Sequence, residues 1–121
     1  MAEAIAKSLD AGKALRIESA GISAEPGSPA TAEAIQAMKQ MGIELSGHRA
    51  RHVAQVHLDD FDVIVALSPS VASQLRQLAP QTDSKIIVWD VADPFGQGQA
   101  AYYDAAQQIK ALVVGLIGNE R

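Results

Sequence analysis

The clearest candidate for acid–base chemistry lies at residues 93–96, which read Asp-Pro-Phe-Gly. Asp93 is a candidate general acid, and Phe95 is a candidate aromatic wall for a pocket beside it. The same residue types also form turns, because aspartate followed by proline and glycine favours a reversal of the chain. Composition alone favours the turn, so a catalytic role for Asp93 needs support from the rest of the sequence.

Residues 96–101 fit the G-x-G-x-x-A pattern of dinucleotide-binding loops. The pattern follows the last expected strand of the chain, whereas a dinucleotide loop follows the first strand. Asp93 would also repel a pyrophosphate group bound beside it. Nucleotide binding is therefore a weaker alternative. A serine nucleophile has no support either, because the sequence lacks the G-x-S-x-G elbow.

Three histidines lie close together in the sequence, at His48, His52 and His57. A spacing of four would place the first two on one face of a helix, where they could bind a metal ion. Arg49 and Arg51 are interleaved with them, and two ligands do not hold zinc. A hydrogen-bonded structural role is favoured, and no metal or cofactor is expected.

The composition is that of one globular domain spanning residues 1–121, with 48% hydrophobic residues and a formal net charge of −4. An acidic chain lacks the basic face that nucleic acid or an anionic membrane surface requires. No apolar run approaches the roughly 18 residues of a membrane span, and the first residues do not resemble a secretory signal. The chain has no cysteine. A cytoplasmic location is expected.

Helices and strands are expected to alternate along the chain. The apolar pattern predicts helices over residues 1–9, 29–41, 69–78 and 102–116, and strands at 15–19, 63–67 and 86–89. Ser28 and Ser68 each precede a proline and are expected helix N-caps, and Gly42 is an expected helix stop. Such alternation predicts a parallel sheet covered by helices, with the active site at the carboxyl ends of its strands. A sheet of this kind normally opens with a strand, whereas this chain opens with a helix.

Several short segments, in the right order, resemble low-molecular-weight protein tyrosine phosphatases. These segments are residues 1–6, 18–21, 42–51, 60–67 and 93–96. The resemblance implies an α/β three-layer sandwich with a parallel sheet, as in phosphotyrosine protein phosphatase I. It also implies that the first and central strand of that sheet, together with the C-x5-R phosphate loop that follows it, is missing from these residues.

The resemblance implies roles for individual residues. Asp93 would be the general acid, Phe95 would line the aryl pocket, and Ser19 and His48 would brace the phosphate loop by hydrogen bonds. The family's thiolate nucleophile and phosphate-binding arginine have no counterpart in this sequence. The chain also departs from many relatives at residues 67–68, where Leu-Ser replaces Met-Asp.

Because the nucleophile and the phosphate-binding arginine are absent, we expect the chain to be inactive as written. It would be a fragment of a phosphatase whose start codon was assigned too late, or a remnant of one. The alternative is a non-catalytic binding or regulatory module. An arsenate reductase relative is less favoured, because those enzymes need additional cysteines. The expected ligand is a phosphotyrosine protein or a small aryl phosphate once the loop is restored. A strand-donating partner or self-association is expected to complete the sheet.

Overall fold

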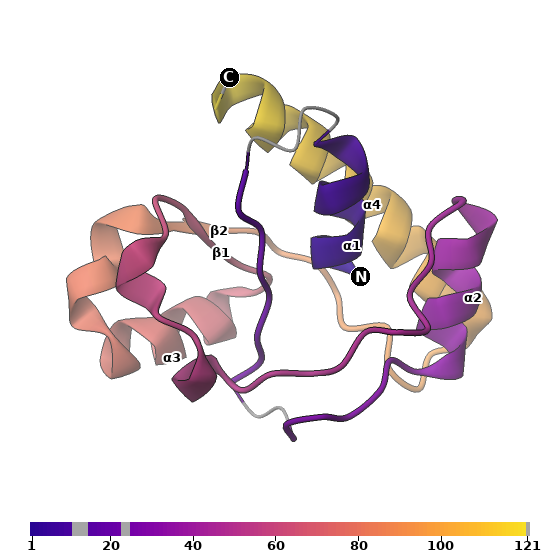
Figure 1. The fold of residues 1–121 in the computed structure, drawn as a ribbon, viewed down its shortest axis with the longest axis horizontal. Coiled ribbons are helices and arrows are strands. Elements are labelled where there is room, and N and C mark those ends of the chain that lie inside the picture. Colours follow the sequence, from indigo (N-terminus) through magenta and orange to yellow (C-terminus); the bar gives the residue numbers. More distant parts are fainter. Residues whose placement is uncertain (11–14, 23–24, 121) are drawn as a thin grey trace.

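The structure is a computed structural model that describes residues 1–10, 15–22 and 25–120 (Figure 1). Its helices are α1 (Ala2–Leu9), α2 (Ala32–Gln40), α3 (Pro69–Leu78) and α4 (Gln99–Glu120), and its strands are β1 (Ile64–Ala66) and β2 (Ile86–Val88). Short 3-10 turns occupy Val53–Gln55, Leu58–Asp60 and Pro80–Lys85. The predicted alternation of helices and parallel strands is confirmed from residue 63 to the end of α4.

β1 and β2 pair in parallel, with Ile64 opposite Ile86 and Ala66 opposite Val88. α3 connects the two strands and packs against them, so that Ala72 and Leu75 share a buried cluster with Ile64 and Ala66. Figure 1 shows α3 on one side of the strand pair and the remaining helices on the other. The chain therefore has the layered α/β architecture that the sequence predicts.

The larger core cluster lies among α1, α2 and α4. Ile5 and Met38 are fully buried there, and they pack with the buried stripe of α4 that includes Tyr102, Ile109 and Val113. This stripe follows the helical period predicted for residues 102–116. The cluster fixes the first turn of α1 and the start of α4 relative to each other.

The strand predicted at residues 15–19 is not present as a strand. This segment is extended but pairs with no strand in the described part of the chain. A strand is defined by its hydrogen-bonded neighbour, and the apolar pattern of a segment does not supply that neighbour. The first ladder-like contact comes after it, where Gly21 bridges His52 in parallel.

The predicted N-cap at Ser28 is wrong. α2 begins after Thr31, whose Oγ1 accepts a hydrogen bond from the Ala34 N–H at 3.2 Å. Ser28 is instead held by an antiparallel bridge, in which its carbonyl accepts from the Ala50 N–H at 2.8 Å. The predicted cap at Ser68 is confirmed, since its Oγ accepts from the Val71 N–H.

The predicted stop of α2 at Gly42 is confirmed: the helix ends at Gln40, and Gly42 adopts a φ of 75°. The prediction that residues 86–89 form a strand buried on both faces is wrong in its burial, because Val88 is 40% exposed. Within the described residues β2 pairs with β1 alone, so it lies at an edge of the sheet. The described helices include none that is long and apolar enough to cross a membrane.

Candidate functional site

Ser19 and His48 converge on the first turn of α1, where Glu3 lies. The Ser19 hydroxyl donates to Glu3 Oε1 at 2.7 Å. His48 lies close enough for its charge to act on the same carboxylate. The two residues expected to brace a phosphate loop thus meet at the carboxylate of Glu3, which was not among the expected site residues. The sequence offers one signal for Glu3: Lys7 lies four residues later, the spacing of an ion pair on one helix face.

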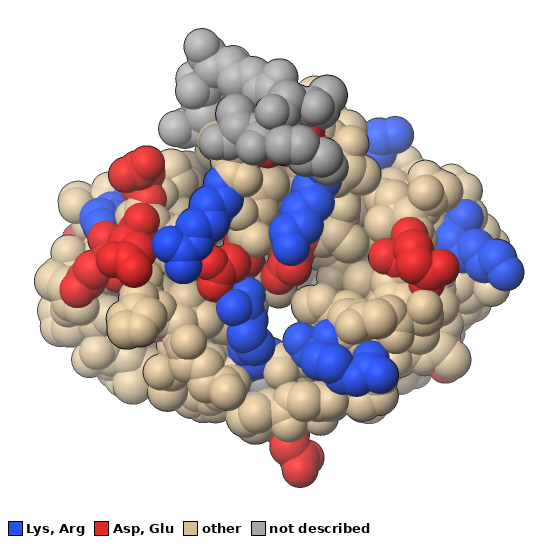
Figure 2. Space-filling view, viewed as in Figure 1, with Lys and Arg blue, Asp and Glu red and all other residues tan. Residues whose placement is uncertain are grey.

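Glu3 is the centre of a charge network that joins three parts of the chain. Its carboxylate is 2.9 Å from Lys7 Nζ and 3.8 Å from Arg51 Nη2, while Arg51 Nη1 is 2.9 Å from Glu18 Oε1. Arg16 pairs with Glu18 from the other side. Figure 2 shows basic side chains around acidic ones in the middle of one face. The network ties α1 to the segments around residues 18 and 51.

The carboxylates of this network titrate below their ordinary range. Burial opposes ionisation of Glu3, but hydrogen bonds from Ser19 and Lys7, with the positive charges of Lys7 and His48, outweigh it and lower the pKa of Glu3. A hydrogen bond from Arg16, with further help from Arg51, lowers the pKa of Glu18 against a smaller opposing effect of desolvation. Glu3 is therefore held as an anion in the first turn of a helix, where the helix dipole favours negative charge.

Asp93 lies in the loop between β2 and α4 and is exposed. Its Oδ1 accepts a hydrogen bond from the Phe95 N–H at 3.0 Å, the side-chain-to-backbone bond of an Asx turn. Gly96 and Gly98 follow with φ values of 78° and 92°, a conformation that other residues adopt only with strain. The turn interpretation of this loop therefore holds, and it fixes where the Asp93 carboxylate and the Phe95 ring lie.

Asp93 and the start of α1 line the same cavity, which has a volume of about 170 Å³. Its lining includes Met1, Ala2, Leu67 and Val91 as well as Asp93. The cavity thus lies where the N-terminus of α1, the carboxyl end of β1 and the loop after β2 meet. A helix N-terminus presents unpaired N–H groups that bind anions. The cavity therefore lies at the carboxyl edge of the sheet, where the alternation of helices and strands predicts an active site.

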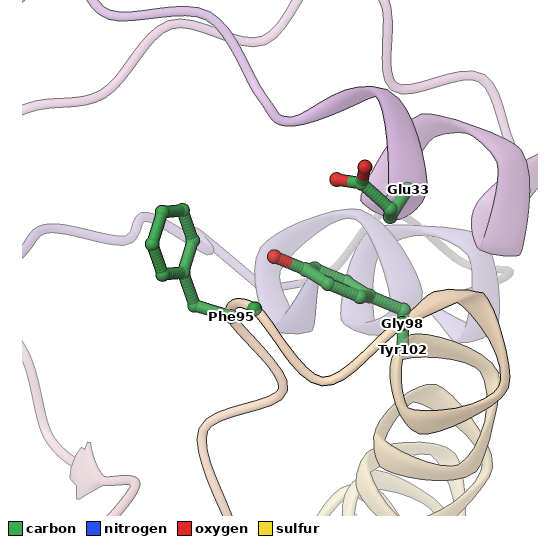
Figure 3. Close-up of a pocket in the computed structure, with 5 residues that line it drawn as sticks. Glu33, Phe95, Gly98 and Tyr102 are labelled. Carbon is green, nitrogen blue, oxygen red and sulfur yellow. The ribbon is translucent and has the colours of Figure 1, made fainter.

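A larger cavity of about 350 Å³ lies on the other side of the same loop (Figure 3). It is lined by Glu33, Phe95, Gly96, Gly98 and Tyr102. The Phe95 side chain is 70% exposed, so its ring forms a wall of this cavity without belonging to the core. Tyr102 lies on the apolar stripe predicted for residues 102–116, whereas no local signal in the sequence links Glu33 to a loop more than 60 positions away.

His48 and His52 make contacts in different places and do not share a site. His52 Nδ1 accepts from the Ala54 N–H at 3.0 Å and caps a 3-10 turn. His48 lies beside Glu3, and its backbone N–H donates to the Leu45 carbonyl. In the described ranges, no three His, Asp or Glu side chains are grouped so that they could hold a metal ion.

The protein is an α/β protein with a parallel sheet. A loop carrying the Asp93 carboxylate and the N-terminus of α1 lie at the carboxyl edge of that sheet. Comparison of the sequence with protein families identifies the family: the model of the "low molecular weight phosphotyrosine protein phosphatase" family matches residues 1–120. The chain belongs to this family.

Individual relatives agree with this assignment. The chain is 31% identical over 119 residues to a glutaredoxin arsenate reductase of Synechocystis, covering 97% of this chain and 85% of the relative. It is 32% identical to the low molecular weight protein-tyrosine-phosphatase YfkJ of Bacillus subtilis, covering 91% and 80%. A crystal structure of a low molecular weight protein tyrosine phosphatase from T. tengcongensis superposes with a TM-score of 0.89 at 32% identity, covering 98% of this chain and 88% of that one.

Proposed function

We propose that residues 1–121 carry the general-acid and pocket part of a phosphomonoester hydrolase site, with Asp93 as the acid and Phe95 as the aryl-pocket wall. The observation that carries the proposal is the cavity that Asp93 shares with the start of α1 and the end of β1. A phosphoryl group placed there would meet the N–H groups of the first turn of α1. Its leaving oxygen would face the loop of Asp93.

In this scheme a thiolate attacks phosphorus and the bond to the leaving oxygen breaks. Asp93 gives its proton to that oxygen, then takes a proton from the water that hydrolyses the phosphocysteine. Ser19 and His48 act indirectly, by positioning Glu3 and with it the first turn of α1. Because the 121 residues contain no cysteine, we propose that they do not turn over phosphate esters by themselves. We favour phosphate over arsenate as substrate, because the family's arsenate reductases use additional cysteines.

The role of Asp93 is testable in a chain extended by an apolar strand and a C-x5-R-S-P loop in front of Met1. Asp93→Asn should lower turnover of phenyl phosphate by about 10²–10³-fold. The loss should be smaller for p-nitrophenyl phosphate, whose leaving oxygen needs less protonation. Asp90→Asn is the matched control, since Asp90 is an exposed carboxylate in the same connection. Equal losses for both esters, or equal effects of both variants, would refute the assignment.

A non-catalytic binding module is the second candidate. The observation in its favour is that residues 1–121 form the cavity beside Phe95 although they contain no cysteine nucleophile. Titration of residues 1–121 with phenylphosphonate, followed by the amide signals of Gly96 and Gly98, tests binding alone. Saturable binding combined with no turnover in the extended chain would favour this module over the enzyme.

We also propose that the open edge of β1 accepts a strand from another chain or a second copy. In the described part of the chain β1 pairs with β2 alone, and unpaired strand edges template further pairing. Arg16 stacks 4.9 Å from the ring centre of Phe61, which places the extended segment at 15–19 near the start of β1. Sedimentation that shows only monomer, unchanged by an added apolar strand peptide, would contradict this.

A cytoplasmic location is also part of the proposal and is testable by cell fractionation.

A further inference from the structure

The cavity beside Phe95 is bordered by a carboxylate from a helix that is remote in sequence. Figure 3 shows the Glu33 carboxylate, the Phe95 ring and the Tyr102 hydroxyl directed toward one shared space. Glu33 belongs to the first turn of α2, and Tyr102 belongs to the first turns of α4. The cavity therefore combines a negative charge with two aromatic surfaces.

The backbone at Glu33 is held in place by two contacts at the start of α2. The Thr31 cap fixes where α2 begins. The Gln99 side-chain amide donates to the Glu33 carbonyl at 3.0 Å, which ties the first turn of α2 to the first residue of α4. Tyr102 as a whole residue is 5% exposed and belongs to the buried core cluster. A preorganised wall of this kind lowers the entropic cost of binding a ligand.

The two polar side-chain groups of the cavity, the Glu33 carboxylate and the Tyr102 hydroxyl, have no partner within the described residues. Glu33 makes no ion pair there, and the Tyr102 hydroxyl makes no hydrogen bond. Among the residues that the structure describes, no lysine or arginine lines the cavity. A carboxylate forms strong hydrogen bonds with ammonium and guanidinium groups, and aromatic faces attract the same cations. A carboxylate beside two aromatic rings favours a cationic group in this cavity.

We propose that Glu33, Phe95 and Tyr102 form a subsite for a basic side chain, lysine or arginine, of a peptide that carries the phosphoryl group. This rests on the proposed function, which places the phosphoryl group in the cavity of Asp93. Asp93 borders one cavity and Phe95 the other, and because these residues are two apart in the sequence, their Cα atoms are at most about 7 Å apart. A basic residue one or two positions from the phosphorylated residue spans that distance.

The cation subsite is testable on residues 1–121 without any phosphoryl group. The probe is a short peptide with one arginine flanked by glycines, compared with its neutral citrulline counterpart. The arginine peptide should shift the amide signals of Gly96 and Gly98 and bind about tenfold more tightly. Glu33→Gln should abolish that preference, whereas Glu25→Gln, an exposed control with the same charge change, should preserve it.

Phe95→Ala supplies a second variant that leaves the core intact, because the ring is largely exposed. It should weaken arginine binding several-fold with unchanged circular dichroism. Equal binding of arginine and citrulline peptides, or an unchanged preference in Glu33→Gln, would overturn the subsite. A phosphotyrosine added one position from the arginine should strengthen binding further. If only that gain is missing, the placement of the phosphoryl group at Asp93 fails and the cation subsite stands.

Discussion

Replacing the largely buried Glu3 by alanine should destabilise the fold more than replacing an exposed carboxylate such as Glu25. The change removes the acceptor of the Ser19 hydroxyl at 2.7 Å and the partner of Lys7 at 2.9 Å. A hydrogen bond to a charged group contributes about 1.5–3 kcal/mol. The half-exposed Lys7 pair adds only about 0.3–0.5 kcal/mol. The expected loss in free energy of unfolding is therefore about 2–3 kcal/mol.

The measurement is urea unfolding at pH 7, with thermal unfolding as a second readout. A loss of this size should lower Tm by roughly 6–12 °C in a chain of this length. Glu25→Ala is the control, since Glu25 is exposed and its substitution should change the free energy of unfolding by less than about 0.5 kcal/mol. Combining Glu3→Ala with Ser19→Ala should cost less than the sum of the two, because both remove the same bond.

The charge of Glu3 adds a pH dependence with a definite sign. Its pKa is lowered in the folded state, so the unfolded chain takes up the proton first as the pH falls. The stability that the charge contributes is present above the ordinary carboxyl range and disappears as the pH falls below about 4. The gap between the wild type and Glu3→Gln should close in that interval. A gap that is constant from pH 7 to pH 3 would refute the network as described.

Two further substitutions, each with a control variant, test the local geometry. Thr31→Ala should cost about 1 kcal/mol of stability in urea unfolding through loss of the α2 cap, and Ser28→Ala should cost far less; the opposite order would place the helix start wrongly. Gly42→Ala should cost about 1 kcal/mol because of its positive φ, whereas Gly115→Ala within α4 should be neutral or stabilising by the same assay.

Signals that act over a few residues were readable from the sequence. Ser68 followed by proline predicted the start of α3, and Gly42 predicted the end of α2, because a cap or a stop depends on the adjacent turn alone. The same rule failed at Ser28, where Thr31 lies three residues on and the bridge to residues 49–50 decides between the two. A local signal cannot rank two neighbouring caps when a remote segment holds one of them.

Features that depend on remote partners were not readable from the sequence. The Glu3 network joins residues up to 48 positions apart, and the cavity of Glu33 and Tyr102 joins helices whose contact only the fold determines. The extended segment at 15–19 has the apolar pattern of a strand, but pairing depends on a neighbour. The family resemblance supplied the fold and the candidate roles of Asp93 and Phe95, which composition alone did not.

The proposal that residues 1–121 supply the general acid but not the nucleophile is tested most directly by one comparison of phosphatase rates. Residues 1–121, and the same residues preceded by an apolar strand and a C-x5-R-S-P loop, are assayed with p-nitrophenyl phosphate under identical conditions. We predict no hydrolysis above background for residues 1–121 and saturable turnover for the extended chain, lost when its cysteine is replaced by serine. Turnover by residues 1–121 alone, or none by a folded extended chain, would contradict the proposed site.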